Sequence, residues 1–230
     1  MWGEWISSMN QEILNNLIIE YKQLFENVWE FGGGYGFRYH HGVRVMNYCK
    51  KIAKYPRFKN ENLNIDALLI SALFHDIGKI EAVNKSGQLI YGNYGGISHD
   101  ALGAKIVPKH LEKYIKDKEL INLICLIISE QEGKITPTRI ESKIIKDADR
   151  LDHYGVLHLW CSITYANYQK KNIEGLKEFW DGEEGKKKYE ANFSKFYFPE
   201  VRAVAEKRFE NLTKTTELMF EEQDANDILS

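Results

Sequence analysis

Residues 64–79 read NIDALLISALFHDIGK and hold a regular apolar pattern beside a pair of polar residues. Its apolar residues recur every three to four positions, the spacing of a helix with one buried face; they are Ile65, Leu68, Leu69, Ala72 and Leu73. The pattern predicts a helix from about residue 65 to residue 76, with Gly78 as its stop. The adjacent pair His75-Asp76 then lies at the end of a helix that faces an apolar core.

The same spacing extends in both directions along the chain. It predicts further helices at about residues 14–28, 40–55, 99–108, 120–128, 139–168 and 199–222. Glycine-rich segments at residues 31–37 and 81–97 predict loops, because glycine weakens helices. We therefore expect an all-α fold, a compact helical bundle that forms a single domain over residues 1–230, with no sheet larger than a hairpin.

Composition and charge exclude several classes of protein. Hydrophobic residues make up 43% and charged residues 28% of the 230 residues, a globular mixture that argues against wholesale disorder. The formal net charge is −2, which excludes a nucleic-acid binder driven by bulk positive charge but leaves room for a local basic pocket. The three cysteines are far apart and form no CxxC pair, so a reducing, cytoplasmic location is expected. No secretory signal or membrane span is expected either.

Four polar residues interrupt the apolar stripes of three predicted helices: His41, His75, Asp76 and Asp149. A buried aspartate is costly unless it is paired or bound to a metal, and two imidazoles with two carboxylates suit one divalent cation. Taken singly, His41 also fits a helix cap or a core histidine, and Asp149 a solvated charge. Taken together, the four predict a site for Mn, Fe, Co, Ni or Zn; Mg is less favoured because of the imidazoles.

Three motifs occur in order along these helices: HHGVRV at residues 40–45, LFHDIGK at 73–79 and DADRLD at 147–152. Over about residues 36–165 they resemble the HD-domain metal-dependent phosphohydrolase superfamily. The resemblance implies a helical HD fold with His41, His75, Asp76 and a closing aspartate as metal ligands. The A-D-x-L context of the last motif favours Asp149 as that aspartate, with Asp147 as the alternative.

Some members of that superfamily bind two metals and have extra histidines between the doublet and the last aspartate. Here His99, in ISHDALGAKI, resembles the first of them, but the next ones are absent and the corresponding region reads IISEQEGK. We therefore expect one metal. A second site that uses His99 with Asp76 as a bridge is the alternative, and His99 as a helix cap or a substrate contact is another. Glu130 is best placed to substitute for a missing histidine.

The expected chemistry is hydrolysis at phosphorus. A metal ion would acidify its bound water and polarise the phosphoryl group. Asp76 takes part as a ligand and is thereby a compromised base, which leaves Glu130 as the candidate base. Arg44, one turn after His41, and Lys79, three residues after Asp76, are candidates to bind the substrate phosphate. For Lys79 the alternative is simple compensation of the helix dipole.

We expect a metal-dependent phosphohydrolase acting on a phosphate ester of a nucleotide or related small molecule. Aromatic residues in the two glycine-rich loops would stack on a base or, alternatively, only cover the surface; they are Tyr35, Phe37, Tyr39, Tyr91 and Tyr94. A phosphodiesterase or nuclease for cyclic or single-stranded nucleic acid is one rival, which the charge balance disfavours. A metal- or nucleotide-binding regulatory module without turnover is the other rival. No membrane partner is expected.

Overall fold

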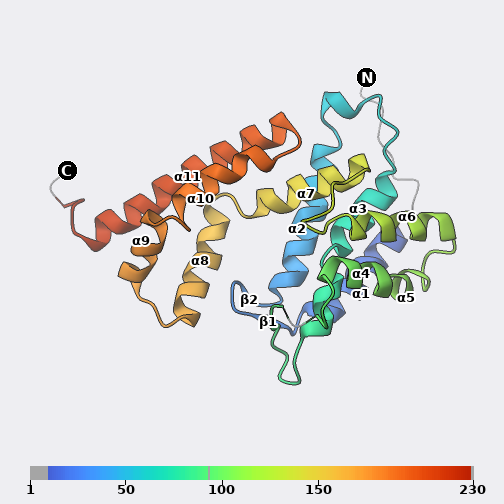
Figure 1. Ribbon diagram of the computed structural model, residues 1–230, viewed down its shortest axis with the longest axis horizontal. Helices are drawn as coiled ribbons and strands as arrows, with labels where there is room; N and C mark the ends of the chain where they lie inside the picture. The colour runs from blue at the N-terminus through green and yellow to red at the C-terminus, as the bar shows by residue number, and fades with distance from the viewer. Residues whose placement is uncertain (1–9, 93, 229–230) are drawn as a thin grey trace. The chain divides into compact units, whose positions relative to one another are not determined.

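The computed structural model describes residues 10–92 and 94–228, and these are mostly helical, as Figure 1 shows. The chain divides into two compact units. The first comprises Met1–Glu30 with Tyr35–Ala148, and the second comprises Phe31–Gly34 with Asp149–Ser230.

The first unit holds most of the predicted helices. Its elements are α1 (Gln11–Phe25), α2 (Phe37–Ile52), the 3-10 helix η1 (Pro56–Phe58), α3 (Ile65–Phe74), the 3-10 helix η2 (Ile77–Ala82), α4 (His99–Ile106), α5 (Pro108–Leu111), α6 (Lys118–Ser129) and the first part of α7 (Ile140–Asp152). Two short strands, β1 (Trp29–Glu30) and β2 (Gly34–Tyr35), pair with each other. In the described residues the sheet is therefore no larger than the predicted hairpin.

Helix α3 is the centre of the first unit. Its N-terminus is capped by the side chain of Asn64, which accepts a hydrogen bond from the amide of Ala67. The helix is buried from Asp66 to Phe74 and packs against α1, α2 and α6, which lie around it in Figure 1. The sequence predicts one apolar face, but burial extends around the whole helix because neighbours cover every side. Its C-terminal end is thereby placed inside the core.

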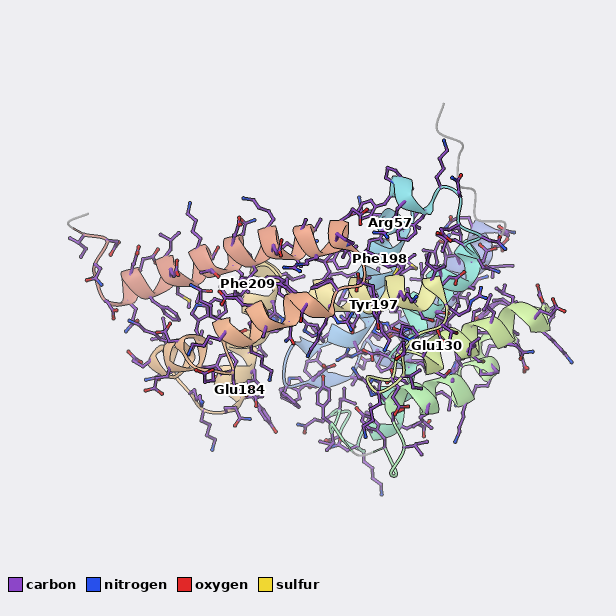
Figure 2. The ribbon with its side chains drawn as sticks, turned by 45° about the horizontal axis from the view of Figure 1, so that its top comes forward. Arg57, Glu130, Glu184, Tyr197, Phe198 and Phe209 are labelled. Carbon is purple, nitrogen blue, oxygen red and sulfur yellow. The ribbon has the colours of Figure 1, made fainter. Side chains whose placement is uncertain are left out.

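The second unit is built around aromatic side chains. Its elements are the end of α7, α8 (Val156–Tyr168), α9 (Ile173–Asp181), α10 (Lys186–Ala191), the 3-10 helix η3 (Asn192–Lys195) and α11 (Pro199–Gln223). Phe209 on α11, labelled in Figure 2, contacts the rings of Tyr154, Trp180, Tyr189 and Phe193, with centroids 5.7–6.2 Å apart. Pairs at such distances are the usual way in which aromatic cores pack.

The prediction of one helix over residues 139–168 is wrong. Helix α7 ends at Asp152 and α8 begins at Val156. Between them Gly155 has φ of 102°, a left-handed conformation that helices do not contain and that glycine adopts readily. The apolar spacing continues through this turn, which is why periodicity alone missed it. No helix in the described residues has the length and apolarity needed to cross a membrane.

Candidate metal centre

Helix α2 brings His41 against the end of α3. Arg38, His41, Val45 and Cys49 are spaced at three to four residues and all are buried on the face turned to the core. Gly42 allows this close approach: a Cβ there would lie 2.6 Å from Tyr21 Cε1 and 2.7 Å from the carbonyl oxygen of Leu73. The missing side chain therefore lets the two helices meet directly beside His41.

The three predicted ligands of the first unit converge. His41 Nε2 lies 3.2 Å from His75 Nε2 and 3.6 Å from Asp76 Oδ2, and His75 Nε2 lies 3.4 Å from the same oxygen. All three residues are buried, and within the described part of the chain they form one group whose ligand atoms lie within 4.8 Å of one another. Two ligands of one transition-metal ion are typically about 2.8–3.8 Å apart, given bonds of about 2.0–2.3 Å and angles of about 90–110°. The spacing fits a shared divalent cation.

His75 is oriented by the backbone. Its Nδ1–H donates to the carbonyl of Ala72 at 2.8 Å, which leaves Nε2 to face His41 and Asp76. Histidines that bind metals usually donate their other ring N–H to a carbonyl or a carboxylate, and this bond fixes the tautomer. The adjacent pair His75-Asp76 therefore directs one ring nitrogen and one carboxylate to the same point.

Two cations contact the Asp76 carboxylate. Arg38 donates from Nη1 to Oδ2, and Lys79 Nζ lies 2.9 Å from both Oδ1 and Oδ2. Burial by itself would raise the pKa of Asp76, but Lys79, Arg38 and His75 outweigh it and hold that pKa well below its usual range. Asp76 is therefore ionised at neutral pH, as a carboxylate ligand must be.

Arg38 is one of the residues beside Asp76 that sequence reasoning missed. It lies three residues before His41, as Arg44 lies three residues after it, so both flank His41 on the helix. Both guanidinium groups lie near the ring of Phe37, at 5.4 Å for Arg38 and 5.5 Å for Arg44, and Arg38 also donates to Asp76. That ring is in turn stacked on His41, at 6.0 Å. The role of Arg44 in phosphate binding stays a prediction.

His99, at the first turn of α4, faces the same carboxylate from the other side. Its Nε2 lies 3.3 Å from Asp76 Oδ1 and 3.3 Å from Asp100 Oδ1. Gly78 makes this contact feasible, because a Cβ there would fall 1.9 Å from the carbonyl oxygen of His99. Asp100, which the sequence did not single out, is buried, and burial raises its pKa. The structure thus brings His99 to Asp76, and its part in a second metal site or in substrate contact stays a prediction.

Glu130, labelled in Figure 2 at the end of α6, has a full set of hydrogen bonds in the α6–α7 connection. Its carboxylate accepts from the amide and the hydroxyl of Thr138, from the amide of Arg139 and from the Ser142 hydroxyl. Burial would raise its pKa, but the bonds from Ser142, Thr138 and Arg139 lower it. These contacts give Glu130 a structural role, and its role as a base stays a prediction.

The two aspartates proposed as closing ligand both lie on α7. Asp147 is fully buried in the first unit, whereas Asp149 is partly exposed and belongs to the second unit. Asp149 as the fourth ligand stays a prediction. The described geometry therefore gives the spacing of three predicted ligands, and a fourth ligand stays a prediction.

The fold and this site place the chain in a known family. The HD domain family matches residues 38–154, about half of the chain, and the protein belongs to it. This is the superfamily of metal-dependent phosphohydrolases, as the three sequence motifs predicted. No curated protein matches the chain.

Solved structures share the fold at low sequence identity. Bacillus subtilis YpgQ in complex with ADP has a TM-score of 0.61 at 16% identity, covering 92% of this chain and 95% of its own. A HD-superfamily hydrolase from Bacillus thuringiensis has a TM-score of 0.61 at 18% identity and 94% and 98% coverage. A predicted HD superfamily hydrolase from an uncultured Thermotogales bacterium has a TM-score of 0.58 at 19% identity and 94% and 99% coverage. The mostly helical HD fold is thereby confirmed.

Proposed function

We propose that the protein is a metal-dependent phosphohydrolase that cleaves a phosphate ester of a nucleotide or a related small molecule. The observation that carries this proposal is the convergence of His41, His75 and Asp76 with two cationic side chains on Asp76. Stability alone does not call for two imidazole nitrogens and a carboxylate buried together at this spacing, because burying such polar groups costs free energy.

The residues divide into two sets by role. His41, His75, Asp76 and, by prediction, Asp149 would hold one divalent ion, of which Mn, Fe, Co, Ni and Zn suit the donor set. A bound ion supplies an acidified water and polarises the phosphoryl group. Arg38 and Lys79 would neutralise the equatorial oxygens of the phosphoryl group, which need positive charge around them.

His99 suits contact with the substrate. Its side chain is 30% exposed, whereas those of Asp76 and Lys79 are 4% and 12% exposed. Its Nε2 faces both Asp76 and Asp100, so it can hold a proton next to the reacting phosphate. Asp76 is poorly suited to act as a base itself, because Arg38 and Lys79 already bind its carboxylate.

A nucleotide is favoured by the aromatic side chains around the cations. The Tyr91 ring lies 5.9 Å from Lys79 Nζ and is 41% exposed, and the Tyr94 ring lies 5.6 Å from that of His99. An exposed ring beside a phosphate-binding cation suits stacking on a base. The structural relative YpgQ, crystallised with ADP, supports the same choice of substrate class.

Metal-depleted protein should be supplied with each of the five metals and a panel of nucleoside mono-, di- and triphosphates. We expect metal-dependent release of inorganic phosphate or pyrophosphate from at least one nucleotide, and none from His75→Ala. Cleavage of cyclic nucleotides or short single-stranded RNA in preference would favour the phosphodiesterase alternative. Metal and ADP binding without turnover of any member of the panel would overturn the proposal and favour a regulatory module.

A further inference from the structure

The guanidinium of Arg38 is held from behind by a second carboxylate. Glu30, on strand β1, is 2% exposed and Arg38 is 5% exposed. Arg38 donates from Nε to Glu30 Oε2 at 3.2 Å and from Nη2 to Glu30 Oε1. This is the two-bond arrangement between a guanidinium and a carboxylate that fixes the plane of both groups. One edge of the guanidinium is taken by Glu30, so its Nη1 end points to Asp76.

Tyr91 closes the arrangement from the loop that follows η2. Its hydroxyl donates to Glu30 Oε1 and accepts from Arg38 Nη2 at 2.9 Å. The backbone supports this position: the amide of Trp29 donates to the carbonyl of Gly87 at 2.8 Å, and the amide of Leu89 donates to the carbonyl of Trp29 at 2.9 Å. The loop therefore runs along β1 and brings Tyr91 to the residue that follows Trp29.

The charges also require Glu30. Arg38 and Lys79 both contact the Asp76 carboxylate. The single negative charge of Asp76 is therefore shared between two positive charges. Glu30 supplies a second negative charge next to Arg38, and a buried guanidinium without such a partner would be costly. Glu30 accepts from Nε and Nη2 of Arg38, whereas Asp76 accepts from Nη1, so the two carboxylates bind different edges of the guanidinium.

We propose that Glu30 is a positioning residue that keeps the Nη1 end of Arg38 turned to Asp76 and to the substrate phosphate, and that the Tyr91 hydroxyl holds Glu30 in place. Glu30 itself touches neither metal nor substrate. This inference rests on the proposed function, because it assigns Arg38 to the phosphate. It explains why a carboxylate is buried on a strand of two residues beside the site.

The test measures ADP binding to the metal-loaded protein by calorimetry, so that it does not depend on turnover. Glu30→Gln should weaken ADP binding about tenfold, as expected when a charged contact loses its alignment, with metal content unchanged. Glu61→Gln, at an exposed carboxylate of the same unit, is the matched control and should bind ADP as the parent does. In an Arg38→Met background, Glu30→Gln should have no further effect, since there is no guanidinium left to orient.

An equal loss of ADP affinity in both backgrounds, no loss in either, or a loss of metal from Glu30→Gln would overturn the inference. Should Glu30→Gln fail to fold, Tyr91→Phe keeps the ring and removes only the hydroxyl. It should weaken ADP binding in the parent, and not in the Arg38→Met background; the same loss in both backgrounds would likewise overturn the inference. If the parent binds no ADP or inorganic phosphate and hydrolyses no nucleotide, the proposed function itself fails, which is a distinct outcome.

Discussion

The Nε2 atoms of His41 and His75 lie 3.2 Å apart, although 34 residues separate the two histidines in the sequence. Both rings are buried, and two protonated imidazoles at this distance would repel each other. The pair therefore needs a shared proton or a shared cation between the two nitrogens. Asp76 Oδ2, 3.6 Å from His41 Nε2 and 3.4 Å from His75 Nε2, adds a third donor atom for such a cation.

Removing a ligand should remove the metal. His75→Ala and Asp76→Ala should each lose most of the bound metal after dialysis, because a site that lacks one of its four proposed ligands binds more weakly. Metal content by inductively coupled plasma mass spectrometry checks this. His40→Ala, at the exposed neighbouring histidine, is the control and should keep the metal. Parent protein should also gain about 2.7 kcal/mol of stability at a metal concentration of about 100 times Kd, and His75→Ala should gain none.

The closing ligand can be identified by a pair of matched variants. Asp149→Asn should weaken metal binding by about tenfold to a hundredfold or more, since losing even an indirect contact to a metal costs about that much. Asp147→Asn should keep the metal and instead lower the thermal midpoint, because Asp147 is fully buried. Metal titration and thermal unfolding of both variants decide between them. The reverse pattern would assign the ligand to Asp147.

Gly78 should tolerate no side chain. In Gly78→Ala the new Cβ would meet the backbone of α4, 1.9 Å from the carbonyl of His99 and 2.7 Å from the amide of Gly103. Backbone cannot move aside as a flexible side chain can, so we expect a loss of about 1–3 kcal/mol or more. Chemical denaturation measures it. Gly133→Ala, where a Cβ meets nothing within 4 Å, is the control, and equal losses in the two variants would contradict the explanation.

His158 in the second unit should resist protonation. Burial and the neighbouring His153 lower its pKa to about 4, against the opposing effect of Asp152. Between about pH 6.5 and pH 4 the unfolded chain binds a proton there that the folded chain does not, so stability falls by up to about 3 kcal/mol as the pH drops through this window. His158→Gln should flatten that part of the stability profile.

Nuclear magnetic resonance titration of the imidazole shifts tests the cause directly. His153→Ala should raise the pKa of His158, because the repelling positive charge is gone. A titration of His158 near its ordinary value in the parent protein would contradict the burial argument.

Helix α3 and the pair His75-Asp76 could be predicted from the sequence because the apolar spacing that indicates them lies within one short stretch of chain. Helix α3 ends at Phe74, two residues before the predicted end, and His75-Asp76 follow it directly. The mostly helical fold was predicted correctly for the same reason, since apolar spacing is a property of each helix alone. Gly155 shows the limit: the spacing runs on through it, while its φ of 102° ends the helix.

The contact between Arg38 and Asp76 could not be predicted from the sequence, because residues three positions before and three positions after His41 lie equally close to it on the helix. Arg38 and Arg44 lie three residues on either side of it, and only the packing of α2 on α3 decides which one meets Asp76. Glu30 was missed together with its partner Arg38, and its other partner, Tyr91, lies 61 residues away along the chain. Such contacts depend on how the loop after η2 returns to β1.

The carboxylate of Glu130 has a consequence for the segment that it binds. Two of its donors are the backbone amides of Thr138 and Arg139, which precede helix α7. A deuteron can replace an amide hydrogen only when its bond opens, so these two should exchange with solvent at the pace of helical amides. In hydrogen exchange the amides of Thr138 and Arg139 should then behave like those in the first turn of α7. In Glu130→Ala the same two amides should exchange rapidly, as loop amides do.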